Sequence, residues 1–78
     1  MTFSEALELL KRGKKVTRSG WNGKDMWIAI MPAHQVSEGS HLMESYVYMK
    51  TAKGTLIPWL ASQADLLATD WETWETYR

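Results

Sequence analysis

The chain has 78 residues, no cysteine, and nine basic and nine acidic side chains, so its formal net charge is zero. This length fits a single domain over residues 1–78, the charge balance argues against general nucleic-acid binding, and the absence of cysteine excludes disulfides. A metal site is not expected, because the only histidines lie in a polar stretch without thiolates. A membrane segment is not expected either, because the apolar runs are short. No cofactor is expected, and a cytoplasmic location is the simplest expectation.

The first predicted element is an amphipathic helix over about residues 3–12. Thr2 and Glu5 have the spacing of a capping box. Four apolar residues then recur at the spacing of one buried helix face: Phe3, Ala6, Leu7 and Leu10. Gly13 stands where a glycine commonly closes a helix C-terminus.

Residues 14–18 predict a short strand, residues 19–25 a turn, and residues 26–31, "MWIAIM", a second strand. Because side chains alternate along a strand, two apolar sets point to opposite faces: Met26, Ile28 and Ile30 on one, Trp27, Ala29 and Met31 on the other. A strand with one solvated face would alternate with polar residues. A helix, a ligand or another subunit must therefore cover the second face.

Residues 32–44, "PAHQVSEGSHLME", predict a polar loop that is the best candidate for a mobile segment. Residues 45–60 then carry the signal of a hairpin. Gly54 supplies the positive φ of its turn, and Pro58 ends the ladder of its second strand.

Ser62 and Asp65 form a second, weaker capping box and predict a helix of about one and a half turns. Residues 70–78 predict an edge strand that closes the sheet. The expected architecture is α+β, with an N-terminal amphipathic helix packed on a small antiparallel β-sheet.

Catalytic motifs are missing from the sequence. It has no nucleophile elbow, no Walker-type or dinucleotide-type glycine motif, and no helix-borne pair of metal ligands. Candidate acids and bases exist, but isolated carboxylates at turns and caps and solvated loop histidines are far more often structural or exposed: Asp25, Asp65, Asp70, His34 and His41. We assign no catalytic residue and do not expect an enzyme.

Four tryptophans lie beside turns that carry polar groups: Trp21, Trp27, Trp59 and Trp71. Flat aromatic faces next to a few fixed donors and acceptors suit a purine or another planar ligand. Any one of these tryptophans is more often part of a small core than of a binding site. Four of them beside turns favour a ligand site or an interface with a partner.

Two long stretches resemble a known family: "TFSEALELLKRGKKVTRSGWNGKDMW" and "MKTAKGTLIPWLASQADLLATDWE". The block from "PWLASQ" to "DW" is the most specific part, and residues 32–44 depart from the family pattern. The family comprises short phage and prophage proteins that are similar to the second type of Thoeris anti-defence protein. The resemblance implies a sponge that binds, without cleaving, the cyclic ADP-ribose isomers made by a bacterial TIR-domain defence enzyme. It also implies a homotetramer that holds the ligand between protomers.

The expected ligand site combines the "GWNG" turn with the "PWLASQADLL" segment. In the turn, Trp21 can stack on a base, Asn22 can donate and accept hydrogen bonds, and the flanking glycines let the backbone approach closely. Amides at the start of the second helix suit a phosphate, while Asp65 suits ribose hydroxyls. The complete predicted set is Arg18, Trp21, Asn22, Lys24, Trp27, Trp59, Ser62 and Asp65, with Arg18 and Lys24 neutralising charge.

Two alternatives stay open. Ser62 and Asp65 have an equally good explanation as helix caps that touch no ligand. The whole chain also has a second interpretation, as a structural or adaptor protein of a prophage whose aromatic turns form a protein interface. In either case a small, cysteine-free domain with two apolar strand faces is expected to form an even-numbered homo-oligomer.

Overall fold

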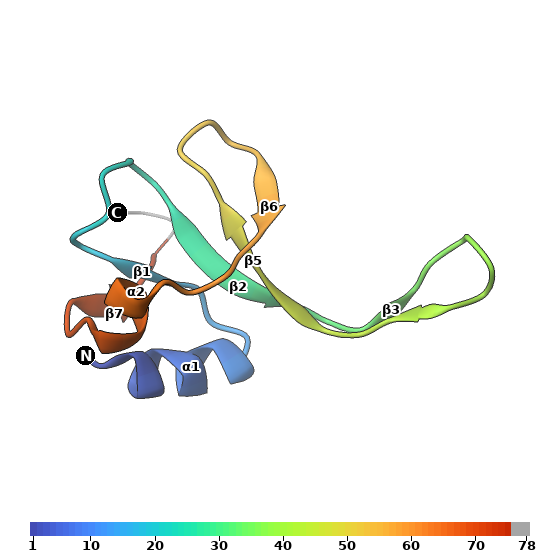
Figure 1. The fold of residues 1–78 in the computed structure, drawn as a ribbon, viewed down its shortest axis with the longest axis horizontal. Helices are drawn as coiled ribbons and strands as arrows, with labels where there is room; N and C mark the ends of the chain where they lie inside the picture. The colour runs from blue at the N-terminus through green and yellow to red at the C-terminus, as the bar shows by residue number, and fades with distance from the viewer. Residues whose placement is uncertain (76–78) are drawn as a thin grey trace.

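The structure is a computed structural model that describes residues 1–75 of the chain. Helix α1 (Phe3–Lys11) packs against an antiparallel sheet of five strands, and a short helix α2 (Gln63–Leu67) lies next to α1 (Figure 1). The sheet contains β1 (Val16–Arg18), β2 (Trp27–Met31), β5 (Tyr46–Lys50), β6 (Leu56–Pro58) and β7 (Trp71–Thr73). A separate two-stranded ladder is formed by β3 (His34–Gln35) and β4 (Leu42–Met43). The predicted fold class is confirmed.

Both helices begin at the predicted capping boxes. The backbone N–H of Thr2 donates to Glu5 Oε1 over 2.8 Å, and the backbone N–H of Ser62 donates to Asp65 Oδ2 over 3.0 Å. In return, the hydroxyl groups of Thr2 and Ser62 accept hydrogen bonds from the N–H groups of Glu5 and Asp65. Local sequence therefore decides where each helix starts.

The end of α1 is closed by a Schellman arrangement. The Gly13 N–H donates to the Leu10 carbonyl over 2.9 Å, and the Lys14 N–H donates to the Leu9 carbonyl over 3.0 Å. Gly13 has a φ of +86°, which a glycine adopts without the steric cost of a Cβ. The predicted role of Gly13 is confirmed.

The sheet order is β6-β5-β2-β1-β7, so that β6 and β7 form its two edges. Strand β7 confirms the predicted edge strand, while residues 76–78 of that prediction lie outside the described residues. In the register, Ile28 pairs with Val16 on one side and with Met49 on the other. These three buried side chains face the helix and form the core together with Ala6, Leu10 and Trp71.

The two apolar faces of β2 are confirmed. Met26 and Ile30 pack against the core around Ile28, whereas Trp27 lies on the opposite face, where its ring is 5.9 Å from that of Tyr48. We call this opposite face the open face, because α1 does not cover it. It carries the side chains of Trp27, Ala29, Met31, Tyr46 and Tyr48, as the register of β2 with β5 requires.

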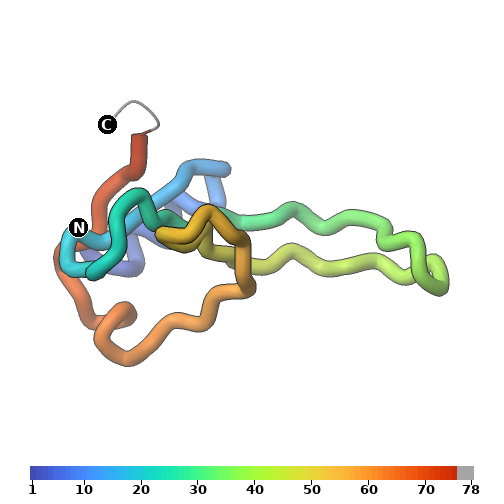
Figure 2. The backbone as a smooth tube through the Cα atoms, turned by 90° about the horizontal axis from the view of Figure 1, so that it is seen from above, coloured from blue at the N-terminus to red at the C-terminus, as the bar shows by residue number. Residues whose placement is uncertain are grey.

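Residues 32–45 form a hairpin arm, so the polar loop predicted over residues 32–44 contains a short ladder that the prediction lacked, and its mobility stays a prediction. His34 pairs with Met43 and Gln35 with Leu42, while Gly39 and Ser40 turn the chain at the tip with φ values of +64° and +56°. The arm extends β2 and β5 away from the helices (Figures 1 and 2). Its strand residues are exposed, so the sequence there lacks the alternation that marks a half-buried strand.

Candidate functional site

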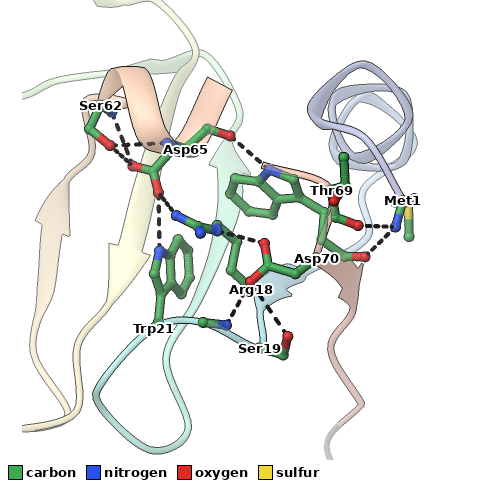
Figure 3. Close-up of polar contacts among 10 residues, drawn as sticks. Met1, Arg18, Ser19, Trp21, Ser62, Asp65, Thr69 and Asp70 are labelled. Atoms are coloured by element: carbon green, nitrogen blue, oxygen red, sulfur yellow. Dashed lines mark hydrogen bonds and ion pairs between the residues drawn. The ribbon is translucent and has the colours of Figure 1, made fainter. Parts of the chain in front are cut away.

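Asp65 joins α2 to β1 and to the turn that follows β1. One carboxylate oxygen, Oδ1, accepts hydrogen bonds from Arg18 Nη1 over 2.8 Å and from Trp21 Nε1 over 3.1 Å (Figure 3). The other oxygen, Oδ2, accepts from the backbone N–H of Ser62 over 3.0 Å and from its hydroxyl over 2.9 Å. The side chain is only 11% exposed. Both carboxylate oxygens are therefore already used within the chain.

Asp70, which precedes β7, completes the same network. Its Oδ1 accepts from Arg18 Nε over 2.8 Å, and its Oδ2 accepts from the Gly20 N–H over 2.7 Å (Figure 3). The Arg18 guanidinium thus lies between the carboxylates of Asp65 and Asp70. Since two negative groups surround one positive group, the network has no net positive charge to offer an anionic ligand.

The electrostatics of this network keep both carboxylates ionised. Burial raises the pKa of Asp65, but the hydrogen bonds from Ser62, Arg18 and Trp21 outweigh it and hold that pKa below its ordinary value. The pKa of Asp70 is lowered chiefly by its hydrogen bond from Arg18. The same two carboxylates raise the pKa of the Arg18 guanidinium, with Asp70 contributing most.

Three tryptophans and one phenylalanine pack together next to this network. The rings of Trp21 and Trp71 meet edge to face at 5.4 Å, those of Trp59 and Trp71 do so at 6.1 Å, and Phe3 lies 5.4 Å from Trp71. The Trp71 indole N–H also donates to the Asp65 carbonyl over 2.9 Å. Trp71 is 2% exposed, while Trp21 and Trp59 are half-buried at the edge of the core. Trp21 and Trp59 therefore support the fold and still present part of their surface.

The glycines of the turn serve contacts within the chain. A Cβ at Gly20 would lie 2.7 Å from Asp70 Oδ2, and a Cβ at Gly23 would meet Met26 Sδ and the Ala52 Cβ. Each glycine thus makes room for a neighbouring side chain. This explains both glycines without a ligand.

The open face carries a second aromatic group. Trp27 lies 5.8 Å from Trp74 and 5.9 Å from Tyr48, measured between ring centroids. The Lys15 ammonium lies 4.1 Å from the Trp27 ring centroid and 5.5 Å from that of Trp74. Both distances fall within the range of a cation–π contact.

The structure brings together five of the eight predicted site residues: Arg18, Trp21, Trp59, Ser62 and Asp65. Trp27 lies apart from them, on the open face. Asn22 and Lys24 are exposed in the turn. A shallow hollow of about 250 Å³ lies between the turn and β7, and its lining includes Arg18, Trp21 and Trp74.

Two groups of the predicted site are engaged within the chain. The N–H groups of Ser62 and Asp65 at the start of α2 donate hydrogen bonds within the capping box. The Arg18 charge is likewise compensated by two carboxylates. Within residues 1–75, no group of three or more histidine, aspartate or glutamate side chains is placed to hold a metal ion, and no helix is long and apolar enough to cross a bilayer.

Comparison of the sequence with known proteins places the chain in a family. The model of the Thoeris anti-defense 2-like domain matches residues 1–74. The chain belongs to this family. It is 38% identical over 82 residues to the Thoeris anti-defense 2 protein of Bacillus phage SP01, and the match covers 92% of each chain.

Membership of the Thoeris anti-defense 2-like family implies that the protein counteracts Thoeris defence. The predicted resemblance is thereby confirmed. Four residues that the structure places beside the predicted set were not among the predicted ligand residues: Lys15, Tyr48, Asp70 and Trp74. The sequence indicates Asp70 as a candidate acid and as a polar group beside the aromatic turns, but not as a partner of Arg18, because that pairing depends on the register of β7 with β1. The alternation along residues 71–74 puts Glu72 and Trp74 on the side opposite to Trp71, and this was an available signal for Trp74.

Proposed function

We propose that this protein is a non-catalytic sponge that sequesters a cyclic ADP-ribose-type signal and so lets a phage evade TIR-based bacterial defence. It would act in the cytoplasm of the infected or lysogenic host. The observation that carries the proposal is the family match over residues 1–74. The half-buried Trp21 beside a polar hollow and the absence of catalytic motifs agree with it.

The network around Asp65 gives the turn its shape. Trp21 is held by its N–H bond to Asp65 and by the edge of Trp71, so its remaining ring surface is presented in one orientation. A preorganised aromatic face costs less conformational entropy on binding than a mobile one. In this arrangement Arg18, Ser62 and Asp65 position the site, while Trp21, Asn22 and Lys24 contact the ligand.

A single chain does not enclose the proposed ligand. The hollow beside the turn has a volume of about 250 Å³, whereas sites for drug-sized ligands usually have about 300–1,000 Å³. Because Arg18 is already paired, Lys24 is left to compensate the two charges of a diphosphate and does so only in part. We therefore propose that the ligand is held between protomers of an even-numbered homo-oligomer, a tetramer by the family resemblance, with the second protomer adding surface and positive charge.

The class of function is tested by recovery of the ligand. The protein is incubated with a glycocyclic ADP-ribose isomer, freed of excess ligand, and denatured by heat. A sponge returns the ligand chemically intact, as chromatography of the supernatant would show. Recovery of an altered product would replace the sponge proposal with an enzymatic one.

Binding itself is tested by thermal shift with a panel of cyclic nucleotides. A ligand at one hundred times its Kd stabilises the folded protein by about 2.7 kcal/mol. Absence of a shift with every member of the panel would favour the alternative, a prophage adaptor that binds another protein.

The place of the site is tested with Asn22→Ala. Asn22 is exposed, so this change leaves the melting temperature of the free protein unchanged. Loss of one hydrogen bond to the ligand is worth about 0.5–1.5 kcal/mol, and isothermal titration measures it. The matched control is Ser37→Ala, an exposed polar residue on the distant arm, and equal affinities of the two variants would place the ligand elsewhere.

A further inference from the structure

The turn between β1 and β2 contains the only asparagine of the chain, Asn22, and Gly23 follows it directly. Asn22 is exposed, and the chain bends over residues 22–25. Asparagine is one of the chemically labile side chains, and its lability is greatest before glycine, because no Cβ shields the next backbone nitrogen. The turn therefore holds one candidate site of deamidation, next to Trp21.

Hydrogen bonds hold this turn at its two ends. The Trp21 N–H donates to the Arg18 carbonyl over 3.2 Å, and the Lys50 ammonium donates to the Asp25 carbonyl over 2.9 Å. Between these ends, residues 22–24 make no hydrogen bond or ion pair with any other residue of the described range 1–75. The backbone nitrogen at the centre of the turn is therefore not held by a carbonyl group, and the chain around it can rotate.

Packing requires a glycine at position 23. A Cβ there would lie 2.9 Å from the Ala52 Cβ and would also meet the Met26 Sδ. The Ala52 methyl group cannot rotate away as a long side chain can, so a larger residue at position 23 would push the turn away from the loop that follows β5. The fold thus fixes the neighbour that makes Asn22 labile.

The reaction needs only these two residues and water. The Gly23 backbone nitrogen loses its proton and attacks the Asn22 Cγ, the bond from Cγ to Nδ2 breaks, and Nδ2 leaves as ammonia. Water then opens the five-membered succinimide at either carbonyl and leaves aspartate or isoaspartate at position 22. The net change is the gain of one water and the loss of one ammonia, without an oxidant or cofactor. Because the attacking nitrogen must lose its proton, the rate rises with pH.

The product carries a negative charge that the asparagine lacks. The chain then has ten acidic side chains against nine basic ones. The new charge stands beside the hollow of about 250 Å³, whose lining already includes Asp25 and Glu72. Arg18, in the same lining, is paired with two carboxylates. A carboxylate at position 22 also lacks the two N–H donors of the amide, so an anionic ligand loses a donor and meets a like charge.

We propose that Asn22 deamidates spontaneously in the folded protein and that the resulting acid weakens ligand binding. The first half stands on the exposure of Asn22, the unheld backbone nitrogen and the glycine that packing requires. The second half rests on the proposed function, in which Asn22 contacts a cyclic ADP-ribose-type ligand. The binding capacity of the protein then decreases with its age, at a rate set by the turn and not by unfolding of the whole domain.

The rate of deamidation in the folded protein tests the first half. The protein is incubated in mildly alkaline buffer with and without urea. Anion exchange separates the acidic product, and mass spectrometry of the tryptic peptide 19–24 locates the change at Asn22. Mobile turns open at almost no cost, so the rate in the folded protein is expected to lie within about tenfold of that in urea. A reaction that required global unfolding would be more than about a thousandfold slower than in urea, and that result would overturn the proposal.

Two controls identify the reacting group. Asn22→Gln keeps an exposed amide, but its longer side chain must close a less favourable six-membered ring, so this variant is expected to yield almost no acidic product. In the wild type, Gln35 and Gln63 serve as internal references and should remain amides over the same time. An equal amount of acidic product from Asn22→Gln would place the reaction elsewhere in the chain and contradict the assignment.

The second half is tested by isothermal titration of a glycocyclic ADP-ribose isomer into Asn22→Asp. Loss of a hydrogen bond to a charged ligand weakens affinity by about tenfold to a hundredfold. Asn22→Asp is expected to bind more weakly than Asn22→Ala, which loses the amide without gaining a charge. Wild-type affinity in Asn22→Asp would refute this half. Absence of binding by freshly made wild-type protein would remove the sponge proposal and the second half together, whereas the deamidation rate is measured without ligand and decides the first half by itself.

Discussion

Arg18 Nη1 lies 2.8 Å from Asp65 Oδ1, and this ion pair connects β1 with α2 across 47 positions of the sequence. Both side chains are largely buried, with exposed fractions of 17% and 11%. Removing the Asp65 charge leaves Arg18 with Asp70 as its remaining carboxylate partner and leaves buried donors short of an acceptor, which costs more than the pair itself contributes. The consequences for stability can be measured directly.

Asp65→Asn is expected to lower the free energy of unfolding by about 2–4 kcal/mol. In asparagine an NH2 group replaces one of the two carboxylate oxygens, and this group cannot accept the hydrogen bonds that the oxygen accepts. Urea unfolding measures the loss. Asp25→Asn is the matched control, since Asp25 is exposed in the turn and has a φ of +56°, a conformation that asparagine also tolerates. Similar losses in the two variants would show that the network contributes little.

The lowered pKa values of Asp65 and Asp70 predict a loss of stability in acid. A carboxyl group whose folded pKa lies below its unfolded pKa stabilises the protein above the unfolded value and loses this contribution as the pH falls through the folded value. For both groups this occurs below their ordinary value of 3.8. The free energy of unfolding, measured with urea, should therefore be clearly lower at about pH 3 than at about pH 6. In Asp65→Asn the difference between the two pH values should be smaller.

The contribution of the Trp21 N–H group to stability can be measured separately from that of its ring. Trp21→Phe keeps an aromatic ring next to Trp71 but removes the donor to Asp65, which is expected to cost about 1.5–3 kcal/mol as a hydrogen bond to a charged group. Trp21→Ala also removes the half-buried ring and is expected to cost more. Guanidinium titrations compare the two. If Trp21→Ala were as stable as the wild type, the ring would serve only a ligand.

Gly20→Ala is expected to weaken the same network from its other end. The new Cβ would lie 2.7 Å from Asp70 Oδ2 and 3.3 Å from Arg18 Nη2, so the carboxylate must move away from Arg18 or from the Gly20 N–H. Overpacking of this kind usually costs about 1–3 kcal/mol. Differential scanning calorimetry should show a lower melting temperature. Gly54→Ala is a useful comparison, because φ is +90° there and nothing lies within 4 Å of the added Cβ, so its cost is backbone strain alone.

Short-range signals in the sequence determined the starts of both helices, the end of α1, the turn at Gly54 and the two apolar faces of β2. Each of these features depends on residues within a few positions of one another: Thr2 with Glu5, Ser62 with Asp65, and the alternation along residues 26–31. The hydrogen bonds and side-chain directions that carry such signals form within one turn or one strand. They are therefore independent of how the rest of the chain folds.

Only the tertiary structure decided which predicted site residues meet and what they do. Arg18 reaches Asp65 and Asp70 over 47 and 52 positions, and no local pattern encodes such a pairing. The sheet register turns Trp27 to the open face and Arg18 to the helix side. The predicted site residues are therefore divided between the two faces of the sheet. The arm was missed for a related reason: its strands bury neither face, and without burial there is no selection for the alternation that would reveal them.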